Sequence, residues 1–439
     1  MSMKRYEKYK PSGIEWIDEL PEHWEVKPIK ASFSTDKGLG ITKADLVEEG
    51  IPVISYGQIH SKLNDFVHTK DALLRFVPVS IIPEGSKSSV GEGDFVFADT
   101  SEDVEGCGNC LYIEKEGIYA GYHTVIARSK SQRDNRYLAF LFSTPCWRSQ
   151  IRAQVYGVKV FSVTQQILKS TKIIVPPIAE QKAIAAYLEA RCGDIDKVVA
   201  TQEKRIALLN EMKQSIITQA VTQGLNLDAK MKDSGVEWIG MVPEHWEVKK
   251  LKFVVSCNDD VLDEKTPKDT VIRYVEISDV DSVNGVKNFT EYEFKNAPSR
   301  ARRITKVDDV IVSTVRTYLK AIARIKDDDL IVSTGFAVLR AKDIDVDYLA
   351  YCSLSQYFID DVISESVGVS YPAINASQLV NIKIALPGIN EQKEIADYLN
   401  QRCAEIDKQI GAMTRQIELL REYKQSLITE VVTGKRKVC

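Results

Sequence analysis

Two long segments of the chain share one spacing of apolar positions. Within residues 176–222 and 387–433, apolar residues recur at alternating steps of four and three, and prolines stand only at the first positions. A period of 3.5 residues with polar flanks is typical of a coiled-coil seam. We therefore predict two uninterrupted helices, each roughly 60 Å long. The predicted seam comprises Leu188, Cys192, Ile195, Val199, Gln202, Ile206, Leu209, Lys213, Ile216 and Ala220, and then Leu399, Cys403, Ile406, Ile410, Met413, Ile417, Leu420, Lys424, Leu427 and Val431.

The two segments are copies of each other. At a constant offset of 211, 25 of the 47 paired positions are identical. A second repeat opens each half: SGIEWIDELPEHWEVKPIK at 12–30 and SGVEWIGMVPEHWEVKKLK at 234–252 match at 13 of 19 positions. Two copies of one element imply two copies of a larger unit. Because buried aromatic side chains usually anchor packing, we expect four tryptophans to lock the two halves, with His23 and His245 hydrogen-bonded inside the locks. The four are Trp16, Trp24, Trp238 and Trp246.

A stretch of mixed pattern lies between each opening motif and its helix. Short β-rich runs such as 51–55, 94–98 and 310–313 are separated by Gly, Asp and Ser, and helical stretches are expected near 136–150 and 346–363. The pattern predicts an α+β globule in each half. The two interiors agree poorly in sequence although their frames match. This contrast suggests two recognition modules for different targets on one kind of scaffold.

These signals divide the chain into six parts. A short polar linker places the second globule near the far end of the first helix, so the second helix can pack on the first only in the antiparallel direction. The expected fold is α+β, with two domains joined by two long antiparallel helices about a pseudo-twofold axis. The parts are 1–175 (first domain), 176–224 (first helix), 225–233 (linker), 234–386 (second domain), 387–434 (second helix) and 435–439 (basic tail).

Composition sets broad limits. The chain has 439 residues, of which 44% are hydrophobic and 27% charged, as is ordinary for a protein that buries a core. No apolar run is long enough to cross a membrane, and the N-terminal residues carry no apolar signal, so we expect a cytoplasmic protein with its eight cysteines reduced. The net charge of −4 does not predict a nucleic-acid binder. Locally, however, residues 295–306 carry five basic side chains and no acidic one.

The sequence shows no pattern for catalysis. A methyltransferase would need an N-P-P-Y or D-P-P-Y type motif, and residues 175–178 (VPPI) lack both the amide and the aromatic; no G-x-x-x-x-G-K-[ST] loop for an ATP motor occurs. Cys107 and Cys110 form a single CxxC, for which a turn is a better interpretation than zinc, so no metal site is predicted. His123 has no accompanying nucleophile pattern and is interpreted as packed or DNA-facing.

The chain resembles the specificity subunits of type I restriction–modification systems over essentially its whole length. The residues that carry this resemblance are the paired P-x-x-EQK-x-IA-x-YL helix starts, with Glu180 and Glu391, the paired helices, and the paired EWI…PEHWEV openings. The resemblance implies a non-catalytic subunit with two target-recognition domains, each reading one half of a bipartite DNA site. It also implies two modification (methyltransferase) subunits and motor–nuclease restriction subunits as partners. S-adenosylmethionine, ATP and Mg²⁺ are then expected on those partners, with no cofactor in this chain.

Base-contacting positions do not follow from the resemblance, because recognition domains vary widely in this family. Recognition of DNA requires Arg, Lys, Asn and Gln at groove edges and cations at phosphates. On that basis the second-domain candidates are Arg300, Arg302, Arg303, Arg316, Tyr318, Lys320 and Arg324, and the first-domain candidates are Tyr56, Gln58, His60, Lys62, Lys87 and Lys159. For each residue a solvated surface cation is an equally good interpretation. The alternative function is a coiled-coil scaffold without DNA specificity, and a third is a self-contained restriction or methylation enzyme.

Overall fold

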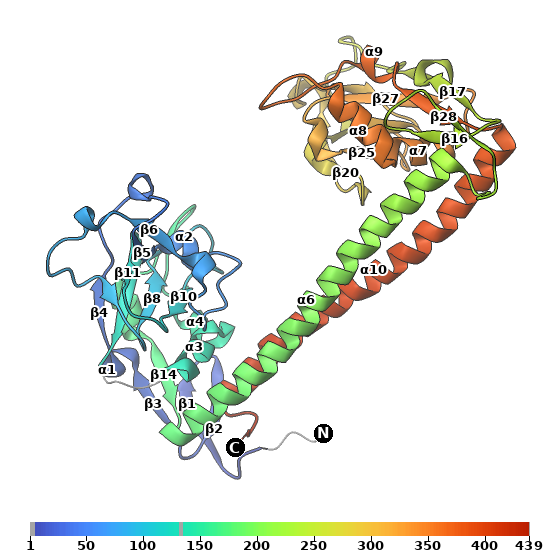
Figure 1. Cartoon of the computed structure of the whole chain (residues 1–439). Helices are drawn as coiled ribbons and strands as arrows, with labels where there is room; N and C mark the ends of the chain where they lie inside the picture. Colours follow the sequence, from blue (N-terminus) through green and yellow to red (C-terminus); the bar gives the residue numbers. More distant parts are fainter. Residues whose placement is uncertain (1–4, 131–134, 439) are drawn as a thin grey trace. The chain divides into compact units, whose positions relative to one another are not determined.

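The computed structural model describes residues 5–130 and 135–438, which form two compact units (Figure 1). Unit 1 comprises Met1–Thr201 and Gln416–Cys439, and unit 2 comprises Gln202–Arg415. Each unit therefore contains one mixed α and β domain together with parts of both long helices. The expected α+β fold with two repeated domains and two long helices is confirmed.

The long helices are α6 (Ile178–Gln223, 46 residues) and α10 (Ile389–Val432, 44 residues). Helix α6 begins just after Pro176 and Pro177, and α10 begins just after Pro387 and Gly388. The first N–H groups of a helix have no acceptor within the helix, so the missing N–H of a proline costs nothing there. Each ends at a glycine, Gly224 or Gly434, whose φ of +74° in both cases is the left-handed conformation that terminates a helix. Among the helices of the described residues, none combines the length and apolar character that a membrane span requires.

The two helices pack against each other in opposite directions. In unit 1 the first turns of α6 share a core with the last turns of α10, where Leu188 and Leu427 are 0% and 1% exposed. In unit 2 the last turns of α6 share a core with the first turns of α10, through Val221 and Leu399. Between these ends the predicted seam positions are buried or partly buried, with Ile206 and Leu209 only partly covered.

Each domain is built on two four-stranded sheets with the same connectivity. In unit 1 the sheet orders are β10-β8-β12-β4 and β6-β5-β11-β7, and in unit 2 they are β25-β24-β27-β18 and β22-β19-β26-β23. Among the described strands, each domain contains one parallel pair, and the two pairs occupy equivalent places: β5 with β11 in unit 1, and β19 with β26 in unit 2. The unit 1 strands are β4 (Phe33–Lys37), β5 (Ile51–Ile54), β6 (Arg75–Val77), β7 (Ser89–Val90), β8 (Phe95–Ala98), β10 (Cys110–Tyr112), β11 (Ile118–Ala120) and β12 (Thr124–Ser129). The unit 2 strands are β18 (Val255–Cys257), β19 (Val271–Val275), β22 (Thr290–Glu293), β23 (Ala301–Ile304), β24 (Val310–Ser313), β25 (Ile322–Arg324), β26 (Leu330–Ser333) and β27 (Phe336–Ala341).

Helices and short ladders complete the domains. The helical stretches expected near 136–150 and 346–363 are each a pair of helices, because Thr144 and Ser355 occupy the junctions in extended conformation. The helices are α1 (Ile29–Ser32), α2 (Tyr56–Ile59), α3 (Arg136–Ser143), α4 (Pro145–Arg152), α5 (Gln165–Ser170), α7 (Val346–Leu354), α8 (Gln356–Ser364) and α9 (Ala376–Leu379). The two-stranded ladders pair β1 (Tyr9–Ile14) with β2 (Ile17–Pro21), β3 (Glu25–Pro28) with β14 (Lys172–Val175), β9 (Thr100–Ser101) with β13 (Phe161–Ser162), β15 (Met231–Asp233) with β16 (Met241–Pro243), β17 (Glu247–Lys250) with β28 (Lys383–Leu386), and β20 (Val280–Asp281) with β21 (Gly285–Val286).

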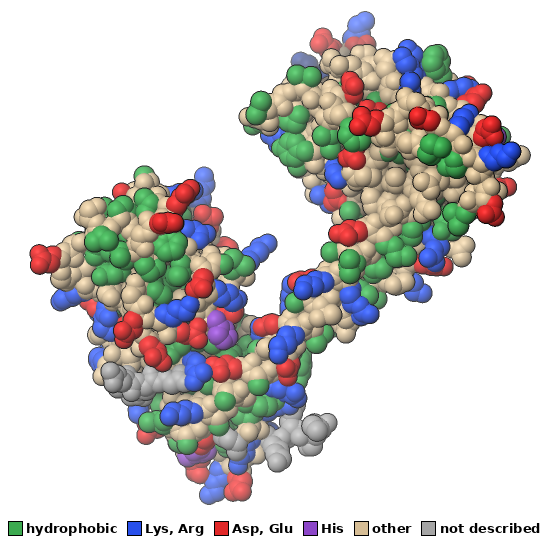
Figure 2. Space-filling model, viewed as in Figure 1, with side chains coloured by type: hydrophobic (Ala, Val, Ile, Leu, Met, Phe, Trp, Pro, Cys, Tyr) green, Lys and Arg blue, Asp and Glu red, His purple; other side chains and the backbone are tan. Residues whose placement is uncertain are grey.

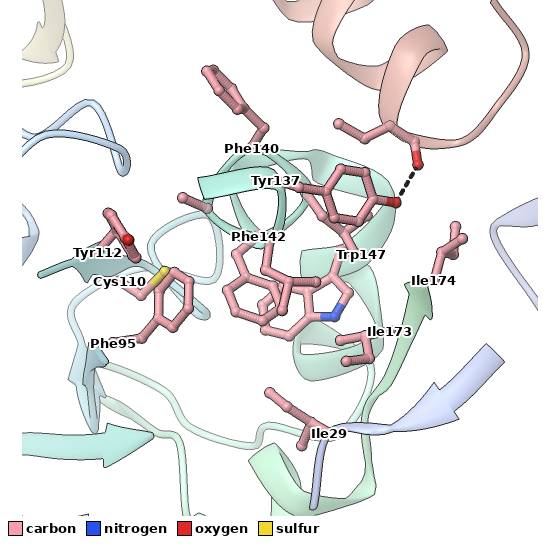
Figure 3. Close-up of a cluster of buried hydrophobic side chains, with 14 of the residues drawn as sticks. Ile29, Phe95, Cys110, Tyr112, Tyr137, Phe140, Phe142, Trp147, Ile173 and Ile174 are labelled. Carbon is pink, nitrogen blue, oxygen red and sulfur yellow. Dashed lines mark hydrogen bonds between the residues drawn. The ribbon is translucent and has the colours of Figure 1, made fainter. Parts of the chain in front are cut away.

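Strand β8 shows why these apolar runs form a buried sheet. All four of its residues are buried, and alternate side chains enter different cores. Phe95 and Phe97 join the larger core beneath α3 and α4, where Phe142 and Trp147 lie with ring centroids 4.2 Å apart (Figure 3). Its other two side chains, at 96 and 98, face the second sheet. The CxxC pair belongs to the same larger core, and burial raises the pKa of the Cys110 thiol.

The opening motif locks each domain onto its long helix. Trp24 is fully buried and donates its Nε1–H to Glu180 at the start of α6 (3.0 Å), while His23 Nε2 lies 2.6 Å from the same carboxylate. The second copy repeats this arrangement with Trp246 and Glu391, also at 3.0 Å. The predicted lock and the hydrogen-bonded histidines are therefore observed.

The other pair of tryptophans in the motif differs. Trp16 and Trp238 are 39% and 44% exposed. The expectation that all four are buried locks is thus wrong for these two. Trp16 and Trp238 lie in the turn of the first ladder, between β1 and β2 and between β15 and β16, whereas Trp24 and Trp246 lie just before the next strand, and only these two are covered.

Each long helix also ends against the domain of the other repeat. Tyr137 of the first domain donates its hydroxyl to the carbonyl of Val432 at the end of α10 (2.9 Å; Figure 3), and Tyr348 of the second domain donates to Val221 at the end of α6 (3.3 Å). A side chain at Gly434 would collide with the ring of Pro21, only 2.4 Å away. Each domain is therefore closed by the end of the other repeat's helix.

Candidate nucleic-acid interface

The loop that follows β24 carries two strained cations. Arg316 and Lys320 flank a 3-10 turn (Thr317–Leu319), and their φ angles of +53° and +52° are left-handed, which costs free energy for a residue with a side chain. The loop is held in this form by its neighbour: the Arg316 N–H donates to the carbonyl of Pro372 (2.8 Å), and Thr317 Oγ1 donates to Ser366 Oγ (2.9 Å). Strain that is maintained in this way is typical of functional loops.

The neighbouring segment is an exposed loop at 367–371. Val367, Val369 and Tyr371 are 77%, 103% and 62% exposed. The Arg316 guanidinium lies 4.7 Å from the ring centroid of Tyr371, in cation–π geometry. Tyr318 is also exposed, at 51%. The two loops 314–320 and 367–371 together form what we call the loop edge of the second domain.

The first domain has a loop edge in the same place. Here the segments 99–109 and 156–160 are joined by β9 (Thr100–Ser101) pairing with β13 (Phe161–Ser162), and Val163 N–H donates to the carbonyl of Asp99 (2.7 Å). The second domain repeats this contact, since Ile374 N–H donates to the carbonyl of Thr314 (2.9 Å). Val163 and Ile374 are separated by the same offset of 211 as the helices, so the two edges are structural equivalents.

Polar and aromatic side chains gather at the first loop edge. His60 donates from Nε2 to the carbonyl of Thr100 (2.9 Å) and accepts at Nδ1 from the amide of Asn109 (3.1 Å), which fixes its tautomer. Among the described residues, Asn109 Oδ1 is a buried acceptor without a hydrogen bond. The ring of Tyr56 packs edge-on against that of His123 at 5.5 Å. Tyr56, His60 and Asn109 border a hollow of 550 Å³ that is also lined by the exposed acids Glu102, Asp103 and Glu105 and by Arg148.

His123 is positioned by its neighbours rather than arranged for catalysis. Its Nδ1 lies 3.3 Å from both Asp99 Oδ1 and Thr100 Oγ1, while the Thr100 hydroxyl donates to Asp99 (2.7 Å). The hydroxyl proton therefore points to the carboxylate and not to the imidazole, so His123 is not placed to accept it. Among the described residues, no group of three His, Cys, Asp or Glu side chains is arranged to hold a metal.

The structure brings several predicted residues to these edges. Tyr56 and His60 lie at the first edge, Lys159 sits in its exposed loop, and exposed Lys62 follows three residues after α2. Gln58 lies on α2 itself, but its Oε1 accepts from the Ser55 N–H (3.1 Å) and caps that helix.

In the second domain, four of the predicted residues lie at the loop edge. Arg316, Tyr318 and Lys320 belong to its first loop. Arg300 lies beside it, since its carbonyl accepts from Thr334 and the next residue, Gly335, contacts Thr314.

Other predicted residues lie elsewhere. The Arg302 guanidinium stacks on Phe294 at 5.0 Å, and Arg303 Nε is buried without a hydrogen bond among the described residues, so the basic run at 300–303 does not present one face. A bulge in β23 separates these side chains. Arg324 is held by two carboxylates, Asp308 at 2.7 Å and Asp347, which favours a structural role over a DNA contact.

Lys87 and Arg324 lie at the opposite end of the sheets from the loop edges. The carbonyl of Lys87 accepts from Arg128, which pairs with Asp94 just before β8, whereas the loop edge begins just after β8. Arg324 likewise pairs with an aspartate just before β24. Neither cation therefore adds to the loop edge of its domain.

Sequence reasoning missed most of the two exposed loops. Of residues 156–160 only Lys159 was among the candidates, and none of 367–371 was. A signal was present, since the pair Gly157-Val158 recurs as Gly368-Val369 at the offset of 211. It was hidden because the surrounding residues differ. Net charge offered no help: in the view of Figure 2, basic and acidic side chains are mixed over both units without one basic face.

Comparisons with known proteins agree on one family. The type I restriction modification DNA specificity domain matches residues 21–210 and 243–413. The MjaVIII specificity subunit of Methanocaldococcus jannaschii is 28% identical over 75% of this chain and 76% of its own length, and the putative MjaX specificity subunit of the same organism is 25% identical over 96% of both. A chain from a solved structure on assembly of the type I R-M system shares the fold, with a TM-score of 0.67 at 18% identity over 94% of this chain and 99% of that chain.

Proposed function

The chain belongs to the type I restriction–modification DNA specificity family, and from that membership we propose that it reads two DNA half-sites, one with each domain. The observation that carries this proposal is the pair of loop edges. Two scaffolds with the same strand order hold loops in equivalent places, and those loops differ in sequence and charge. Such a difference is what recognition of two unlike half-sites requires.

The side chains of the two edges favour different bases. The second edge offers Arg316 and Lys320, and arginine or lysine pairs with the acceptors of guanine in the major groove. The first edge offers the exposed carboxylates of Glu102 and Asp103, which accept from the amino group of cytosine. The two domains thus present complementary rather than repeated chemistry.

As a specificity subunit, the chain directs chemistry that other subunits of the system perform. We propose that one copy binds two modification subunits, because an internal twofold repeat presents two equivalent surfaces to the same partner. Motor–nuclease subunits join this assembly for restriction. S-adenosylmethionine, ATP and Mg²⁺ belong to these partners, and the assembly acts on cellular DNA in the cytoplasm.

A coiled-coil scaffold without DNA specificity is not favoured. The family match extends through both domains as well as the helices. A bare spacer would also not need two domains that hold loops of different charge at equivalent places.

The proposal is tested by selection from random duplex DNA with the chain assembled with its modification subunits. We expect one enriched sequence with two specified blocks and an unspecified spacer of fixed length. A single block, or no enrichment, would contradict it. The chain alone should transfer no labelled methyl groups to DNA, and incorporation by the purified chain would show that the catalytic assignment is wrong.

A further inference from the structure

Both loop edges expose apolar side chains that no part of their own unit covers. Tyr156 and Val158 in the first domain are 88% and 96% exposed, and Val369 and Tyr371 in the second are 103% and 62% exposed. Single exposed apolar residues are normal on a protein surface. Clusters that recur at equivalent places in two repeats are not, and such patches mark binding sites.

The loops are built to hold this conformation. A Cβ at Gly157 would lie 2.2 Å from the carbonyl oxygen of Val160, and Gly368 has a φ of +122° with the carbonyl of Tyr371 nearby. Both loops therefore turn tightly at a glycine. After each loop the chain pairs back to its domain, Phe161 with Ser101 and Ala373 with Val315, and Thr164 then caps α5 by accepting from Ile167 N–H (3.2 Å). The apolar side chains are thus presented by a fixed turn.

The charges around the second loop indicate an anionic partner. Arg316 and Lys320 border this loop, whereas the first loop contains Lys159 and lies beside the exposed acids Glu102, Asp103 and Glu105. A basic surface with apolar tips matches double-stranded DNA, whose phosphates attract cations and whose major groove carries one apolar group, the thymine methyl.

A shared protein partner fits the loops less well. The glycine and valine at the tip are the same in both loops (Gly157-Val158 and Gly368-Val369), but the side chains that flank them differ: Tyr156 corresponds to Val367, and Val160 corresponds to Tyr371. A surface that binds two copies of one protein partner would be expected to keep the flanking side chains as well, as the helices and opening motifs do.

We propose that the loops 156–160 and 367–371 read base edges through apolar contact, with Val158 and Val369 packing on thymine methyl groups, one loop in each half-site. This inference rests on the proposed function, since it needs each domain to meet a specific half-site. It assigns the loops a role that is distinct from the cations beside them. The cations hold phosphate and polar base edges, and the valines discriminate by shape.

The test uses the chain assembled with its modification subunits and the target duplex found by selection. Val158→Ala should weaken binding to the target about tenfold, as loss of one good base contact does, without changing the salt dependence, because an apolar contact releases no counterions. Replacing thymines of the first half-site by deoxyuridine should weaken the unaltered protein similarly and should have no further effect on Val158→Ala. Val369→Ala should behave in the same way for the second half-site only.

The controls separate the possible outcomes. Val79→Ala changes a valine that is 68% exposed on the 3-10 turn Val79–Ile81, and it should leave both readouts unchanged. Thermal unfolding midpoints of all three variants should match the original chain because the sites are exposed. If the unaltered assembly shows no sequence preference, the proposed function fails. If the unaltered assembly prefers its target but neither the deoxyuridine replacement nor the valine variants change that preference, the inference about the loops is overturned and the proposed function stands. The same holds if the valine variants weaken binding to all DNA equally.

Discussion

Lys213 on α6 donates to both carboxylate oxygens of Asp407 on α10 at 2.7 Å, and the repeat reproduces the pair as Lys424 and Asp196 at 2.7 and 2.8 Å. Both lysines occupy positions on the predicted apolar seam. Their side chains are only 18% and 24% exposed. A polar pair at a seam position fixes the register of two helices, because any slip leaves a partly buried charge without its partner. Within each unit the pair therefore sets how the two helices align.

The first prediction concerns this register. Lys213→Glu places two carboxylates together and should lower the free energy of unfolding by about 1–2 kcal/mol, because one attractive pair is lost and one repulsive pair is added. Adding Asp407→Lys should restore most of that loss, because the swapped pair can form again. Denaturant unfolding of the four members of this cycle measures it. Lys408→Glu, at an exposed position next to Asp407, is the matched control. Equal losses in the single and double variants would show that the pair does not couple the helices.

A second prediction follows from the Trp24 lock. Burial alone would raise the pKa of Glu180, but hydrogen bonds from His23, Trp24 and Tyr6 outweigh it and hold the pKa below its usual range. A carboxylate with a lowered pKa adds stability that is complete above its unfolded pKa of about 4.3 and is lost as pH falls through the lowered value. Glu180→Gln should therefore be less stable than the original chain near pH 7, and the difference should shrink below about pH 4.

Unfolding free energies measured from pH 7 to pH 3 test this behaviour. Glu48→Gln, at an exposed position of the same unit, should show a much smaller difference at all pH values. A difference for Glu180→Gln that stays constant over the whole range would mean that the carboxylate's charge is not what the lock uses.

The third prediction separates the arginines of the second domain. Arg316→Ala together with Lys320→Ala should weaken binding to the target more than binding to unrelated DNA, because these cations read guanine acceptors, and the loss of two positive charges at the DNA should also reduce the slope of log affinity against log salt by about two. Arg324→Ala should leave the slope unchanged and instead lower stability, since it leaves Asp308 and Asp347 without their partner. Binding titrations at several salt concentrations, with thermal unfolding of each variant, distinguish the two roles. The reverse pattern would place the DNA contact at the other end of the sheet.

The sequence predicts the repeated helices and opening motifs better than it predicts the loops between them. The helices were predictable because their 3.5-residue period is a direct consequence of packing, and because the copy at an offset of 211 repeats that period. The burial of Trp24 and the exposure of Trp16 were not, since both lie in one motif and only the tertiary contact with Glu180 distinguishes them. The run 300–303 looks like one basic patch in the sequence. A β-bulge and stacking on Phe294 direct its side chains to different places, which no local pattern encodes.

A fourth prediction concerns the two long helices as a spacer. Insertion of four residues lengthens a helix by about 6 Å and rotates it by about 40° beyond one full turn, so the seam is nearly kept. Insertion after Gln202 alone would lengthen α6 against α10, so the matching insertion after Met413 is needed to retain the ion pairs of both units. The double insertion should lengthen the preferred DNA spacer by one or two base pairs, at about 3.4 Å each, with both half-sites unchanged. An unaltered spacer in a well-folded variant would show that the helices do not set the distance.

Exchange of one domain tests the central claim most directly. Residues 30–170 lie between the paired strands β3 and β14, which belong to the repeated frame, so the segment can be replaced by that of another family member without cutting a sheet. Sites methylated by the assembly would then be mapped over a whole genome. The account predicts that one half of the target changes to that of the donor while the other half and the spacer stay the same. A change in both halves, or in neither, would contradict the assignment of one half-site to each domain.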